Sequence, residues 1–215
     1  MLDELKNAYK IVGYGLKIKT QLGLAAMFAG LGILIEIFSG GEISTGSFYI
    51  VLSGMFIYQL IISTDISTLV QSSPYKKKIQ CTYPILATAP WLYMTLTILS
   101  VVHAFFARES EEKYLTMCRL TILLGCLLFI LMFYFGLAYK FFVGATVFMV
   151  ISVFPPIFLF QNENALSALC TNLGVCTLIA YLLMTLGVVA CWLITRLTYK
   201  KELSKLAFRA ALRTK

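Results

Sequence analysis

Charged residues are scarce in this sequence, at 13% of 215 residues, while hydrophobic residues make up 60%. This composition excludes an ordinary water-soluble domain and indicates an integral membrane protein. A net charge of +8 would suggest nucleic-acid binding in a polar chain. Here the basic residues flank apolar runs, so they indicate membrane orientation, and no nucleic-acid partner is expected.

The sequence also lacks the usual signatures of cofactor binding. It has no Gly-Lys-Ser/Thr phosphate loop, so any ATP-driven work requires a second polypeptide. Six cysteines form no C-x-x-C pair and only one histidine is present, which argues against a zinc or haem site. We interpret most cysteines as apolar packing residues. Cys118 and Cys170 are both expected near the outer face, and whether they pair stays open.

Catalytic residue sets are missing as well. Glu111 and Glu112, followed by Arg119, are interpreted as a solvated charge cluster in a loop. His103 has no second histidine or helical carboxylate near it in sequence, so we interpret it as a packing or interfacial histidine. The first twenty residues contain early acids and no small-residue cleavage site, unlike a secretory signal. We expect no enzymatic activity, cofactor or metal in this chain.

Long apolar runs are what the sequence does contain. A bilayer core of roughly 30 Å needs about 20 apolar residues per helix. Six runs of about this length predict an all-α, polytopic bundle with six transmembrane helices. They lie at about 22–38, 48–66, 85–107, 120–137, 143–160 and 173–195.

The distribution of basic residues supports six spans. Only the short segment around Lys140 separates the fourth and fifth runs. With six spans, fifteen of the eighteen basic residues fall on one side, leaving Arg108, Lys113 and Arg119 on the other. The positive-inside rule then predicts that both termini are cytoplasmic. Merging the two runs would move seven C-terminal bases outside, which the rule disfavours.

The two ends of the chain have their own patterns, within what we expect to be one transmembrane domain over 1–215. Residues 1–20 predict an amphipathic interfacial helix, with an apolar stripe at Leu2, Leu5, Tyr9, Val12 and Leu16. A soluble tail is the alternative. The six-span bundle occupies 22–195, and residues 196–215 form a basic cytoplasmic tail suited to anionic lipid or, alternatively, to a partner protein.

Ionisable residues inside spans are costly and are therefore functional candidates. Glu36 lies just before Ser-Gly-Gly, so it either reaches the outer interface or takes part in substrate passage. Asp65, at the inner end of the second run, is interpreted as a structural partner of the basic inner loop. Pro155 and Pro156 are expected to break the end of the fifth run, so that the segment to 172 either dips back into the outer leaflet or ends as a kinked helix.

The inner loop between the second and third runs holds the only run of three lysines. Prolines at 74 and 84 bracket it and predict a short rigid helix of about two turns. An ordinary positive-inside loop is the plain alternative. Its central residues are Ser73, Pro74, Tyr75, Lys76, Lys77 and Lys78.

With this loop, the interfacial helix and the six runs, the chain resembles the membrane subunits (permeases) of type-2 ABC exporters, in particular small bacterial members. The resemblance implies a multi-pass permease in a bacterial plasma membrane. It also implies that residues 73–78 form a coupling loop, which docks on a separate ABC-type ATPase that holds ATP and Mg. It further implies pairing with a second permease copy or a paralogue, in contact with membrane lipid. It also implies a substrate path lined by the first, second and fifth spans. The alternative is a non-transporting scaffold that binds anionic lipid or a soluble partner through its basic loop and tail.

Overall fold

The computed structural model describes residues 2–14, 17–40, 45–65, 73–161, 172–202 and 204, and this part of the chain contains helices and no strand. In chain order the helices are α1 (Leu2–Val12), α2 (Ile18–Phe38), α3 (Thr45–Asp65), α5 (Lys76–Cys81), α6 (Tyr83–Phe106), α7 (Glu111–Ala138), α8 (Phe142–Gln161) and α9 (Leu173–Thr198). The predicted all-α class is therefore confirmed for the described residues.

Five helical segments in this part of the chain are long and apolar enough to cross a membrane. They are α2, the segment Lys76–Phe106 that joins α5 to α6, α7, α8 without its last residue, and α9. The chain is thus a membrane-embedded, multi-pass protein. The expected separation of the fourth and fifth runs is confirmed, because α7 ends at Ala138 and α8 begins at Phe142. Helix α3, with 21 residues, packs along α2.

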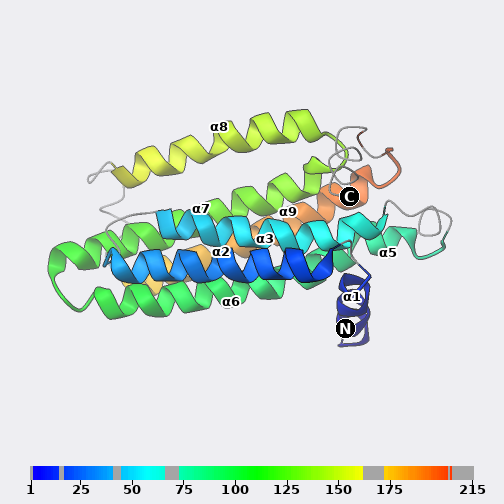
Figure 1. The fold of residues 1–215 in the computed structure, drawn as a ribbon. Helices are drawn as coiled ribbons and strands as arrows, with labels where there is room; N and C mark the ends of the chain where they lie inside the picture. Colours follow the sequence, from blue (N-terminus) through cyan, green and yellow to red (C-terminus); the bar gives the residue numbers. More distant parts are fainter. Residues whose placement is uncertain are drawn as a thin grey trace.

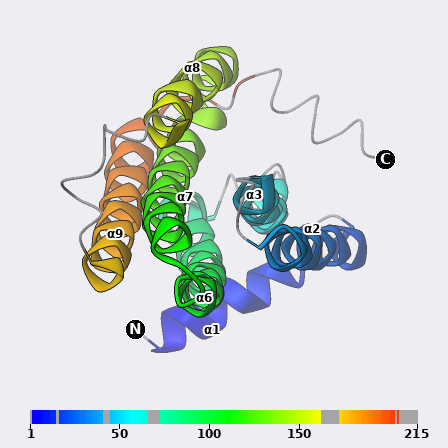
Figure 2. The same ribbon diagram turned by 90° about the vertical axis from the view of Figure 1, so that its left-hand side faces the viewer.

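Helix α7 occupies the centre of the bundle, with α3, α6, α8 and α9 around it (Figure 2). Its leucines at 124, 128 and 131 are fully buried. By contrast, α8 and α9 expose large apolar side chains on their outer faces, including Phe158 and Leu182. An outer surface of this kind suits lipid, where apolar side chains need no cover from other protein.

Helices α7 and α9 approach each other through small residues. A Cβ atom added at Gly125 would lie 2.6 Å from the Cα of Ala180. One added at Gly187 would lie 3.0 Å from the Cα of Phe129. Helices α2 and α3 use the same device, since a Cβ at Gly32 would lie 2.7 Å from the carbonyl oxygen of Gly46. Close backbone approach of this kind is how helices associate in lipid.

The bundle has two distinct ends (Figure 1). We call the one that carries α1, α5 and the C-terminal end of α9 the α5 end. The other, which carries the α6–α7 turn and the C-terminal end of α2, is the α6–α7 end. Helix α1 runs across the α5 end instead of along the bundle.

The buried face of α1 differs in part from the expected stripe. Ala8 and Val12 are buried against a cluster that includes Leu60, Ile79 and Tyr83. Tyr9, which the stripe placed on the apolar face, is 49% exposed. The narrow Ala8 side chain allows α1 to lie close to α6, so the contact centres one residue away from the stripe. Residues 205–215 of the basic tail lie outside the described residues.

The expected helix break at Pro155 and Pro156 is wrong, because α8 continues through both prolines to Gln161. Each proline removes one backbone donor, but its fixed φ is compatible with a helical backbone. The remainder of the proposed re-entrant segment, 162–171, lies outside the described residues.

Candidate functional site

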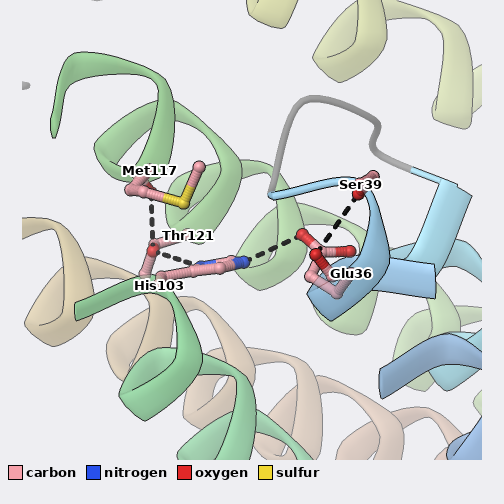
Figure 3. Close-up of polar contacts among 5 residues, drawn as sticks. All are labelled: Glu36, Ser39, His103, Met117 and Thr121. Carbon is pink, nitrogen blue, oxygen red and sulfur yellow. Dashed lines mark hydrogen bonds and ion pairs between the residues drawn. The ribbon is translucent and has the colours of Figure 1, made fainter. Parts of the chain in front are cut away.

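Three polar side chains meet inside the bundle near the α6–α7 end (Figure 3). Nε2 of His103 lies 3.0 Å from Oε1 of Glu36, and Nδ1 of His103 lies 2.8 Å from Oγ1 of Thr121. All three residues have no exposed surface. We call this set the buried triad.

Each member comes from a different helix. Glu36 sits in the last turn of α2 and His103 in the last turn of α6, while Thr121 lies about three turns into α7. Gly46 at the start of α3 leaves the space that the carboxylate fills, because a Cβ there would overlap Oε2 of Glu36. The triad therefore depends on four helices being in register.

The hydrogen bonds of the triad determine where most of its exchangeable protons lie. The single hydroxyl proton of Thr121 is donated to the carbonyl oxygen of Met117 at 2.8 Å. The hydroxyl oxygen then accepts from Nδ1 of His103, which must carry a proton. The contact between Nε2 and Glu36 needs one further proton, held either by the carboxyl group or by the imidazole. The pair thus shares one proton and is neutral overall in both forms.

The rest of the carboxyl group is poorly satisfied. Oε2 of Glu36 has no hydrogen-bond partner among the described residues, and the same holds for the buried hydroxyl of Ser47 on α3. The hydroxyl of Ser39 donates to the main-chain oxygen of Glu36 at 3.3 Å and leaves the carboxyl untouched. A buried acid with a free oxygen is costly unless it keeps its proton or its partner.

The triad has the composition of an acyl-transfer triad but lacks its geometry. A nucleophilic hydroxyl has to face substrate. The hydroxyl of Thr121 is fully buried and points to the carbonyl of its own helix. Within the described ranges no group of three or more His, Cys, Asp or Glu residues could hold a metal ion. The site can hold and move a proton, and the described geometry provides no other chemistry.

Two sequence interpretations are corrected here. His103 is not a histidine without a carboxylate partner, because Glu36 reaches it from another helix. Glu36 does not extend to the interface, since its side chain is fully buried. Thr121 was missed. One signal was available: Glu36 and His103 both lie within three residues of the ends of helices that finish at the same end of the bundle.

The coupling loop forms a second candidate site at the α5 end. Ser73, Pro74 and Tyr75 precede α5, and the Ser73 hydroxyl accepts from the main-chain nitrogen of Tyr75 at 3.1 Å. The predicted short helix is confirmed as α5, although it has only six residues, and Pro84 lies in the first turn of α6.

Helix α5 has an exposed N-terminal half and a buried C-terminal half. Lys77 and Lys78 are exposed and Lys76 is half-buried, whereas the next three residues of α5, beginning at Ile79, are buried. Nζ of Lys78 lies 3.0 Å from Oε1 of Glu4 on α1. Nζ of Lys77 lies 5.2 Å from the ring centre of Tyr199. The lysines therefore connect α1, α5 and the end of α9 at one surface.

The buried C-terminal half of α5 packs into the bundle. The thiol of Cys81 donates to the carbonyl oxygen of Thr195 on α9 at 3.4 Å. Gln80 borders a small cavity of about 20 Å³, which Tyr58 of α3 and Tyr139 after α7 also line. A cavity of this size holds about one water molecule.

The comparisons with known proteins add no assignment. No protein-family model, no curated protein and no solved structure matches this chain. Functional conclusions therefore depend on the two sites described above.

The other sequence candidates are distributed as follows. Asp65 is the last residue of α3, and its side chain lies outside the described part of the chain. Glu111 and Glu112 are not in a loop but in the first turn of α7, where acids favour the helix N-terminus. Arg119 also lies on α7 and donates to the carbonyl oxygen of Leu115 at 3.4 Å. Cys118 is buried in α7, and Cys170 is outside the described residues.

A hydroxyl network that the sequence reasoning missed joins the middle of α6 to α9. The Tyr93 hydroxyl lies 2.8 Å from that of Thr185, and the Thr97 hydroxyl lies 2.7 Å from that of Tyr181. The two tyrosine rings are stacked. These groups satisfy one another, so we interpret the network as a structural contact between spans.

Proposed function

We propose that the chain is the membrane-spanning permease subunit of an ATP-driven ABC exporter, and that α5 docks on a separate ATPase. In this proposal α3 is a sixth span and both termini face the cytoplasm of a bacterial cell. Two copies, or this chain and a paralogue, then pair in the plasma membrane. ATP and Mg are held by the ATPase.

The observation that carries the proposal is the division of α5 into an exposed N-terminal half and a buried C-terminal half. Lys77 and Lys78 are exposed, while the helix also contacts α3, α6 and α9. Closure of an ATPase can shift a transmembrane bundle only through a rigid connection, because a flexible loop would absorb the motion. A short helix seated against three others provides that connection.

The charge at the α5 end also fits a docking surface. Besides the lysines of α5, the exposed Lys200, which follows α9, and the half-buried Lys140, which contacts Lys201, lie at this end. Nζ of Lys140 donates to the main-chain oxygen of Lys201 at 2.6 Å, which holds the α7–α8 turn against the end of α9. A partner with an acidic groove is therefore expected, since complementary charge guides association and register.

In the proposed cycle, nucleotide binding favours the conformation in which the two ATPases are closed. Because α5 is joined to α6 through Thr82 alone, a displacement of α5 reaches α6 directly. The equilibrium between inward-open and outward-open bundles then shifts by the difference in ATPase affinity for the two forms. The proposed substrate path follows α2, α3 and α8, the helices that correspond to the first, second and fifth runs.

Replacing the α5 lysines (K76A/K77A/K78A) is expected to lower the amount of co-purified ATPase by about tenfold or more, equivalent to about 1.4 kcal/mol of binding. The measurement is purification of the tagged chain in mild detergent, followed by quantification of bound protein with ATP-hydrolysing activity. The matched control removes the same charge from the same end, at three exposed lysines outside α5 (K6A/K10A/K200A).

The two variants separate the proposed function from its alternative. Loss in the α5 variant with retention in the control supports docking through α5. Equal loss in both indicates general electrostatic attraction, as in a scaffold that binds anionic lipid or an acidic protein. If the wild-type chain brings down no ATP-hydrolysing protein, the exporter proposal fails.

A further inference from the structure

The buried triad is independent of the α5 end and has a feature that a purely structural contact does not need. Its central hydrogen bond depends on one exchangeable proton. We propose that Glu36 and His103 form a one-proton binding site that ties the end of α2 to α6 and α7, and that release of this proton frees α2 at the α6–α7 end.

The proton count decides what happens on release. With the proton present, either a carboxylic acid donates to Nε2 or an imidazolium donates to the carboxylate, and both forms keep the 3.0 Å bond. When the proton leaves to water, a lone pair of Nε2 faces a carboxylate oxygen. The site then carries one negative charge in a position with no exposed surface.

Rearranging the hydrogen bonds within the triad does not remove this buried negative charge. The Thr121 hydroxyl can turn from Met117 to Nδ1, which lets the imidazole carry its proton on Nε2 and donate to Glu36. That change gives up the 2.8 Å bond to the Met117 carbonyl. Oε2 stays without a described partner, and the net charge stays negative. The tied arrangement is therefore favoured at low pH and weakened as the pH rises.

The charged groups around the site do not supply a substitute cation. Lys113 of α7 lies near the end of α2, at 3.7 Å from a Cβ built at Gly40, but its Nζ is paired with Glu109. Helix α3 contributes Gly46 and the uncharged Ser47, and α6 contributes His103 itself. Elsewhere on this part of α7, Arg119 donates to the carbonyl oxygen of Leu115, the Tyr114 hydroxyl accepts from the main-chain nitrogen of Leu173, and Cys118 belongs to a cluster with Cys176 of α9.

The packing of α2 makes the position of its C-terminal end depend on the hydrogen bond between Glu36 and His103. Helix α2 makes its extensive contact with α3, through the close approach of Gly32 to Gly46, and only a slight contact with α6. The bond from Glu36 to His103 is therefore the main polar link between α2 and the helices beyond α3. Breaking it lets the end of α2 move without opening the α2–α3 contact.

The test is pH-dependent hydrogen exchange of the backbone around 30–40, measured on the full chain in lipid nanodiscs without any ATPase. In the wild-type protein, exchange corrected for the intrinsic rate is expected to rise about tenfold or more between about pH 6 and about pH 9. In Glu36→Gln the amide donates to Nε2 at every pH, so the rise is expected to disappear. The matched control Glu112→Gln, an exposed acid of α7, is expected to behave as the wild type.

A second variant covers the case in which Glu36→Gln does not fold. Glu36→Leu removes the exchangeable proton and the hydrogen bond together, so exchange around 30–40 is expected to be high and equal at the two pH values. The proposal is overturned if the wild-type protein shows no pH-dependent rise, if the folded Glu36→Gln or Glu36→Leu variant keeps it, or if Glu112→Gln also abolishes it. Because no ATPase is present, these outcomes are separate from those of the docking experiment.

Discussion

Replacing Gly125 by alanine is expected to destabilise the bundle by about 1–3 kcal/mol, although alanine is the better helix former. The added Cβ would lie 2.6 Å from the Cα and 2.9 Å from the Cβ of Ala180. Backbone atoms of a packed helix cannot move aside cheaply, so α7 and α9 must separate. Both helices then lose contact at the centre of the bundle. Unfolding of the purified protein in mixed detergent micelles measures the change.

The matched control is Gly144→Ala in α8, because a Cβ at Gly144 would meet nothing within 4 Å. Its expected effect is neutral or stabilising by up to about 1 kcal/mol, from helix propensity alone. If the two variants have equal stability, the close approach of α7 to α9 does not contribute to folding as described. A loss at Gly125 alone supports it.

The helices could be predicted from the sequence because lipid leaves few choices. A backbone segment that crosses a bilayer must satisfy its polar groups internally, so each long apolar run becomes a helix. The sixth run was expected at 173–195, and α9 runs from Leu173 to Thr198. The turn at Lys140 was recognised because a charge there breaks the apolar run.

The packing of the helices could not be predicted in the same way. In a soluble protein the buried face is apolar and the exposed face is polar, whereas lipid-facing and buried residues are both apolar here. Helices α7 and α8 have similar hydropathy. Even so, 78% of the most apolar stretch of α7 is buried, whereas only 6% of the corresponding stretch of α8 is buried. Composition therefore gave no sign that α7 is central and α8 peripheral.

The buried triad was missed for the same reason. Glu36 and His103 are 67 positions apart, and only the arrangement of α2 beside α6 brings them together. Considered singly, each residue had an acceptable explanation as an interfacial side chain. The short helix of the coupling loop was easier to predict from the sequence. Its proline, its lysines and its short length are local signals whose meaning does not depend on neighbouring helices.

Removing one member of the buried pair is expected to produce the largest single effect in this protein. His103→Leu leaves Glu36 buried without its partner, at an expected cost of about 3–5 kcal/mol. Glu36→Leu leaves Nε2 of His103 unsatisfied, at a cost of about 1–3 kcal/mol. The double variant replaces both polar groups with apolar ones. It is expected to be more stable than the sum of the single losses by about 1–3 kcal/mol.

The control for this double-mutant cycle is the more solvated pair of Glu109, in the turn before α7, and Lys113 on α7, whose side chains are 45% and 33% exposed. The same cycle with alanine is expected to give a coupling of only about 0.3–0.5 kcal/mol, because water screens the charges. Equal coupling in the two pairs would mean that Glu36 and His103 are solvated in the membrane protein, and the one-proton site would then have no basis. A large coupling in the buried pair alone would show that the end of α2 is held by a hydrogen bond that water cannot replace.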